Sequence, residues 1–85
     1  MEVAIEKYNE LIELEDEADF HGELGNVYYA MGKWQQAGSS YYEAAVRLID
    51  SGQLAQVGYL QRVIQGLDAE HAEKLAKQLA NTQGK

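Results

Sequence analysis

Few side chains in this sequence are of the types that carry out chemistry. There is no cysteine, so thiolate nucleophiles, disulfides and zinc–sulfur sites are excluded. The remaining candidate nucleophiles and bases are hydroxyls and imidazoles: Ser39, Ser40, Ser51, Thr82, His21 and His71. Neither histidine lies at a spacing from a hydroxyl that is typical of a nucleophilic site, although sequence distance alone does not exclude one. The sequence therefore predicts a protein that is not an enzyme.

Two histidine–carboxylate pairs could contribute to a metal site. Glu17 and His21 are four residues apart, and Asp68 and His71 are three apart, so each pair could share one helix face. A di-iron helical bundle needs two Glu-x-x-His motifs, and the sequence has none. We therefore expect no metal and no cofactor, and we interpret His71 as a solvated residue near the start of a helix.

The acidic charge of the chain is concentrated at one end. The net charge is −7, and residues 1–19 alone hold eight acids and one base. Such a segment repels phosphate, so nucleic acids and anionic membranes are poor partners. Basic stripes and Gly-x-Gly phosphate loops are also missing from the sequence. The acidic segment is either a solvated surface or an electrostatic guide for a basic partner.

The length of the chain allows one small domain, since it has only 85 residues. No apolar run approaches the roughly 20 residues that cross a bilayer, and the acidic N-terminus is unlike a signal peptide. We expect a soluble protein without direct membrane insertion, and a cytoplasmic location is favoured over others. The lack of cysteine leaves the compartment itself undetermined.

Apolar residues recur at helical spacing along the whole chain, which contains no proline. The pattern predicts five helices, over residues 2–15, 18–31, 34–50, 53–65 and 69–81. Gly32 is expected to cap the second helix, Gly66 to end the fourth, and Asp68 to cap the start of the fifth. The tail from Asn81 onward is expected to fray. Because the connections are short, neighbouring helices should lie antiparallel.

Part of the sequence repeats at an offset of 33 residues. When Ala4 is laid on Ala37, Tyr8 falls on Tyr41, and both segments place an aromatic residue four positions after an alanine. The segment between them contains His21-x2-Leu24-Gly25-x2-Tyr28.

This pattern resembles the tetratricopeptide repeat, W-x2-L-G-x2-Y followed by A-x3-F. The departures are His21 in place of the tryptophan, Tyr41 in place of the phenylalanine, and a missing final proline. Residues 18–50 match a complete repeat and residues 2–16 match the second helix of a preceding one. Residues 53–82 match poorly, as a degenerate repeat or a capping hairpin. The resemblance implies an all-α fold of stacked antiparallel hairpins, a short α-solenoid, in one domain over residues 1–85 of a larger protein.

The resemblance also suggests why glycines occur inside helices, where each costs roughly 1 kcal/mol relative to alanine. It implies that the two helices of the repeat pack closely at Gly25 and Ala37, and Gly58 is interpreted in the same way. Gly22 would leave room in a groove, and Gly38 has no sequence-based explanation. Four aromatic residues are expected in the core, Tyr8, Tyr28, Trp34 and Tyr41, and three on the surface, Tyr29, Tyr42 and Tyr59.

In tetratricopeptide proteins the first helix of each repeat lines a concave groove that binds a partner. Carried onto this chain, the groove-facing positions are Asp19, Gly22, Asn26 and Tyr29, and at the offset of 33 residues Ala55, Tyr59 and Arg62. Some family members bind a C-terminal carboxylate with a lysine that here is replaced by Gly22, so that clamp is broken.

Three functions of different classes follow. The favoured one is a protein–protein interaction module, a scaffold or adaptor that binds a peptide or helix of a protein partner, which could carry basic residues. The alternative is a self-association module that forms weak homo-oligomers through the first helix, because residues 2–15 have no preceding helix to cover their outer side. A third, an enzyme or small-molecule carrier, would require a pocket with convergent polar groups.

Overall fold

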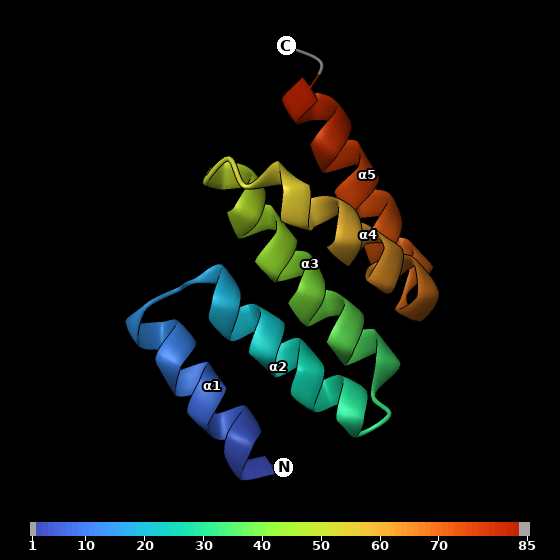
Figure 1. Ribbon diagram of the computed structural model, residues 1–85. Coiled ribbons are helices and arrows are strands. Elements are labelled where there is room, and N and C mark those ends of the chain that lie inside the picture. The colour runs from blue at the N-terminus through green and yellow to red at the C-terminus, as the bar shows by residue number, and fades with distance from the viewer. Residues whose placement is uncertain (1, 84–85) are drawn as a thin grey trace.

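The computed structural model describes residues 2–83, which form five helices and no strand (Figure 1). The helices, in chain order, are α1 (Glu2–Leu14), α2 (Ala18–Ala30), α3 (Trp34–Asp50), α4 (Leu54–Leu67) and α5 (Ala69–Gln83). The predicted all-α fold class is confirmed, and each helix begins and ends within two residues of its predicted position. None of the described helices combines the length and the apolar character needed to cross a membrane.

Glycines end α2 and α3 in the same way. Gly32 and Gly52 have φ angles of +73° and +80°, in the left-handed region that side chains disfavour. The Gly32 N–H donates to the Tyr29 carbonyl at 3.0 Å, and the following Lys33 N–H donates to the Tyr28 carbonyl at 2.9 Å. Gly52 and the residue after it make the equivalent two bonds at the end of α3. This is the Schellman arrangement, which fixes both connections, and the predicted cap at Gly32 is confirmed.

The end of α4 differs from the prediction, because the helix continues through Gly66 to Leu67. Asp68 alone connects α4 to α5, and its Oδ1 accepts a hydrogen bond from the Glu70 N–H at 3.1 Å. The predicted cap at Asp68 is therefore confirmed. Gly66 weakens α4 without ending it. The boundary between α4 and α5 is set by Asp68, the cap of α5.

The end of α5 also differs, since the helix continues beyond its predicted end at residue 81, and the last two residues of the predicted tail, 84–85, lie outside the described residues. The helix extends to Gln83. Leu79 packs against the hydrophobic core, and the Thr82 hydroxyl donates to the Gln78 carbonyl at 3.0 Å. These two contacts hold the last described turn in place.

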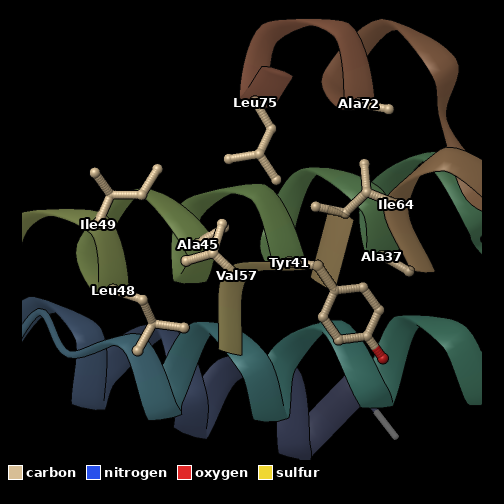
Figure 2. Packing of buried hydrophobic residues seen from close by; sticks show 9 residues of the cluster. All are labelled: Ala37, Tyr41, Ala45, Leu48, Ile49, Val57, Ile64, Ala72 and Leu75. Carbon is tan, nitrogen blue, oxygen red and sulfur yellow. The ribbon is translucent and has the colours of Figure 1, made fainter. Parts of the chain in front are cut away.

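Each helix runs antiparallel to the one before it, and α1 and α5 lie at opposite ends of an elongated molecule (Figure 1). Helix α3 is central, because it packs against α2, α4 and α5, whereas α1 packs only against α2. The main hydrophobic cluster accordingly comes from α3, α4 and α5 (Figure 2). It consists of Ala37, Tyr41, Ala45, Leu48, Ile49, Val57, Ile64, Ala72 and Leu75.

Close packing explains two of the glycines. A Cβ atom on Gly25 would lie 2.6 Å from Cε1 of Tyr41, whose ring reaches from α3 toward α2 in Figure 2. Close packing at Gly25 is thus confirmed, but the three atoms nearest to its Cβ position belong to Tyr41 and not, as expected, to Ala37. A Cβ on Gly38 would lie 2.8 Å from Cβ of Asp68, so α3 closely approaches the start of α5.

The same interpretation is wrong for Gly58, where a Cβ would have no neighbour within 4 Å. Gly58 is exposed on α4, so the third hairpin does not repeat the close contact of the second. A Cβ on Gly22 would also lie in open space.

Three aromatic residues are not where the sequence pattern places them. Tyr8 was expected in the core, but it is only half-buried on α1 and lies outside the main hydrophobic cluster. Trp34 is 49% exposed, because it is the first residue of α3 and packs edge-on against exposed Tyr29 at the end of the hairpin. Tyr42 was expected on the surface, but it is half-buried against the core, and its ring lies 5.4 Å from that of His71. Tyr41 is buried as predicted.

Candidate functional site

A groove of about 700 Å³ opens between α2 and α4, with α3 as its floor. Helix α2 contributes one wall, formed by Ala18, Asp19, Gly22, Glu23 and Asn26. The opposite wall, on α4, consists of Ala55, Gln56, Tyr59, Leu60 and Val63. The floor is made by Tyr41, Ala44 and Leu48. No Cα atom of α2 lies within 8 Å of a Cα atom of α4, so the backbones of the two walls stay apart along the groove.

Small residues create the hollow. Each of the three helices that line it contributes a residue with no side-chain atom beyond Cβ: Ala18 and Gly22 on α2, Ala44 on α3 and Ala55 on α4. At Gly22 even a Cβ would find open space. The lining residues of each wall recur at intervals of three or four, so they form one stripe along each helix. The groove therefore forms because small residues lie on the facing sides of the helices.

Most of the residues that the tetratricopeptide resemblance implies for a binding groove lie together in this hollow. Asp19, Gly22 and Asn26 line it from α2, and Ala55 and Tyr59 line it from α4. These residues come from segments far apart in the sequence. Whether they bind a partner stays a prediction.

Two of the implied residues lie outside the lining. Tyr29 is one helical turn beyond Asn26, where its ring stands edge-on to Trp34 with the centroids 5.2 Å apart. Arg62 is exposed on α4 and falls just beyond the edge of the lining stripe. The structure therefore does not bring Tyr29 and Arg62 into the groove with the other implied residues.

The floor of the groove holds Asn26 in a defined orientation. The Tyr41 hydroxyl donates a hydrogen bond to Oδ1 of Asn26, which leaves the amide Nδ2 directed to donate elsewhere. Burial raises the pKa of Tyr41, and nearby Tyr59, Tyr29 and Glu23 raise it further. The phenol therefore stays neutral and remains a hydrogen-bond donor at physiological pH.

A cluster of polar side chains, the Asp16 clasp, lies near the N-terminal end of α2; it comprises Asp16, His21, Glu43 and Arg47. The Asp16 carboxylate accepts hydrogen bonds from Arg47 Nε at 2.6 Å and Nη2 at 2.7 Å, and His21 Nε2 lies 2.6 Å from its Oδ1. Arg47 also donates from Nη1 to Oε1 of Glu43 at 2.7 Å. The Arg47 guanidinium, and then His21, hold the pKa of Asp16 well below its usual range.

Sequence reasoning missed the Asp16 clasp, because Asp16 and Arg47 are 31 residues apart. No local spacing indicates such a pair. His21 was considered with Glu17 as a possible metal-binding pair, but its partner is Asp16. The clasp links the α1–α2 connection to the last turns of α3, so it positions the start of the α2 wall.

A second hollow of about 540 Å³, the acidic mouth, lies beside the Asp16 clasp. It is lined by Asp16, Glu17, Ala18, Asp19, Arg47, Leu48, Asp50, Ser51 and Gln53. Three of these residues, Ala18, Asp19 and Leu48, also line the groove. The groove therefore continues into the acidic mouth at the N-terminal end of α2.

The second histidine–carboxylate pair has a structural role. His71 Nδ1 lies 2.6 Å from Oδ2 of Asp68, and this contact is the main cause of a lowered pKa at Asp68. The interpretation of His71 as solvated is wrong, because Asp68 and the ring of Tyr42 cover it. Within residues 2–83, no three histidines or carboxylates are grouped so that they could hold a metal ion.

Comparison with known proteins identifies no matching family model, no matching curated protein and no matching solved structure. The resemblance to tetratricopeptide repeats thus depends on the quoted residues of segment 18–50.

Proposed function

We propose that this chain is a protein–protein interaction module of tetratricopeptide-like architecture, which binds a peptide or helix of a partner protein in the groove between α2 and α4. The observation that carries the proposal is the groove itself. Residues implied by the sequence resemblance, among them Asp19, Asn26 and Tyr59, line a single hollow.

The composition of the lining favours binding over catalysis. Its residues include no serine, threonine, histidine or lysine, so the lining offers no hydroxyl nucleophile paired with an imidazole or amine base. The groove is open between two helices whose backbones stay more than 8 Å apart, measured between Cα atoms. Such a shape suits an elongated segment of a partner better than a small molecule, which is usually enclosed on most sides.

Tyr59 is the side chain best suited to anchor a partner. It is 64% exposed on the α4 wall, and tyrosine supplies a large rigid surface with a polar tip, a type enriched among binding hot spots. Leu60 and Val63 extend the apolar surface on the same wall. On the facing wall, Asn26 Nδ2 can donate to a backbone carbonyl of the ligand.

Filling the groove tests the proposal. We would select peptides from a random displayed library on the full chain, then measure their affinity for Gly22→Trp and for a control, Ala76→Trp. Gly22 lies in the groove with open space at its Cβ, so tryptophan should fill the hollow and weaken binding at least tenfold. Ala76 is exposed on α5, outside the groove. Equal binding to both variants would contradict the proposal.

A second function, self-association through α1, is favoured by a separate observation. Helix α1 packs only against α2, has no buried residue, and leaves Val3 and Leu14 75% and 81% exposed. If α1 associates with another chain, Val3→Gln with Leu14→Gln should lower the average mass in sedimentation equilibrium at millimolar concentration. A wild-type chain that stays monomeric there would exclude this function.

A further inference from the structure

The two walls of the groove differ in charge. The α2 wall presents two carboxylates, Asp19 and Glu23, whereas the α4 wall presents no charged residue. No lysine or arginine lines the groove itself. The groove is thus acidic on one side and apolar on the other.

The acidic mouth adds to this negative field. It contributes Asp16, Glu17 and Asp50, and its one base, Arg47, is already bonded to Asp16 and Glu43. Together the groove and the mouth are lined by five carboxylates and one guanidinium, a formal net charge of −4. A helix N-terminus near the acidic mouth, such as that of α2, supplies only about half a positive charge. The carboxylates therefore determine the sign of the local potential.

We propose that the groove selects a cationic amphipathic peptide segment of another protein, an inference that rests on the proposed function. Lysine or arginine side chains of the ligand pair with Asp19 and Glu23, and its apolar side chains contact Leu48, Leu60 and Val63. The end of the ligand with the higher positive charge lies at the acidic mouth.

The spacing of the two wall carboxylates supports this assignment. Asp19 and Glu23 are four residues apart and exposed on the same face of α2, about 6 Å apart along the axis. Like charges at this spacing repel each other in the unbound helix. A ligand cation between them removes that repulsion, whereas an acidic or phosphorylated ligand increases it.

The length of the α2 wall sets how many ligand residues can contact it. Its α2 wall extends from Ala18 to Asn26, a rise of about 12 Å. That distance accommodates about two turns of a helix, or about four residues of extended chain. A ligand of this length can present two basic side chains to one wall and two apolar side chains to the other.

The test begins with the peptides selected on the full chain, restricted to those that Gly22→Trp no longer binds. We expect them to combine lysine or arginine with apolar residues. Their affinity is then measured by fluorescence anisotropy for the double variant Asp19→Asn, Glu23→Gln. Two exposed ion pairs are lost, so Kd should rise about three- to tenfold, and added salt should reduce the difference between wild type and variant.

The matched control is Glu6→Gln with Glu10→Gln. These acids have the same spacing and exposure, but they lie on α1, outside the groove and the mouth. Their neutralisation lowers the overall negative charge equally and should change Kd less than twofold. An equal loss in both double variants would overturn the proposal, because attraction would then depend on net charge and not on this wall. Circular dichroism checks that all variants retain wild-type helix content.

The selection separates failure of this inference from failure of the proposed function. Groove-dependent peptides that are neutral or acidic would overturn the cationic ligand and leave the binding groove standing. If every selected peptide binds Gly22→Trp as tightly as wild type, both the groove function and its ligand class are refuted.

Discussion

Helix α2 has two neighbours, α1 and α3, and the two interfaces differ in how closely the helices pack. Against α3, α2 packs at the buried Gly25, where the lack of a side chain lets the Tyr41 ring lie directly on the α2 backbone. Against α1, the same helix covers an apolar stripe without burying any α1 residue. Both neighbours carry apolar residues at helical spacing. An amphipathic pattern therefore produces a helix, but burial also requires small residues at the contact and a further helix on the other side.

The largest difference in stability is expected between two leucine-to-alanine substitutions, one in the core and one on α1. Leu75 on α5 is fully buried, whereas Leu14 at the end of α1 is 81% exposed. Leu75→Ala should cost about 2–5 kcal/mol, because it leaves a cavity, and Leu14→Ala should change stability by less than about 0.5 kcal/mol. Urea denaturation followed by circular dichroism measures both. Similar losses in the two variants would mean that α1 is packed more tightly than its exposure indicates.

A smaller effect is expected when the close α2–α3 contact is overfilled. Gly25→Leu places side-chain atoms where the buried Tyr41 ring lies, and such overpacking costs about 1–3 kcal/mol. Gly58→Leu is the control, because its Cβ meets open space and leucine favours helix by roughly 0.8 kcal/mol over glycine. In thermal melting, Gly25→Leu should have a lower melting temperature than wild type, and Gly58→Leu a higher one. A melting temperature of Gly25→Leu at or above that of wild type would contradict the packing argument.

The third and smallest effect concerns the Asp16 clasp, which ties the α1–α2 connection to α3. The pKa of Asp16 lies below its usual value near 3.8 because Arg47 and His21 bond its charged form. A lowered pKa contributes stability above about pH 4, and that stability is lost as the pH falls toward the folded-state pKa. Asp16→Asn should therefore have a lower urea midpoint than wild type at pH 7. At pH 2 the difference between the two midpoints should be smaller.

Asp50→Asn serves as the control for the clasp, since Asp50 is an exposed acid at the end of α3. It should leave the pH dependence of the midpoint close to that of wild type. If the two asparagine variants respond alike, the clasp does not stabilise the fold through the Asp16 charge.

Local features of the sequence were enough to predict the helices. Apolar spacing located them, and Gly32 and Asp68 marked ends through backbone hydrogen bonds that depend on a few neighbouring residues. Gly66 was misjudged because a glycine ends a helix only where the backbone turns to positive φ, as at Gly32 and Gly52.

Features that depend on several helices together were harder to predict. Asp19, Gly22 and Asn26 could be placed on one face of α2 from spacing and resemblance. The exposure of Trp34 could not, because it depends on where α3 begins relative to the end of α2. The ion pair of Asp16 with Arg47 connects residues that are 31 positions apart. In the sequence, each of the two looks like an ordinary charged surface residue.

The Schellman ends of α2 and α3 have a consequence for the speed of folding. Each sets the direction of the next helix through hydrogen bonds that span only a few residues around Gly32 or Gly52, so neighbouring helices meet without closing a long loop. Helical chains dominated by such local contacts fold within microseconds to milliseconds. A newly made chain would spend little time with its apolar stripes exposed, and α1, which packs against α2 alone, would be the first helix to open again.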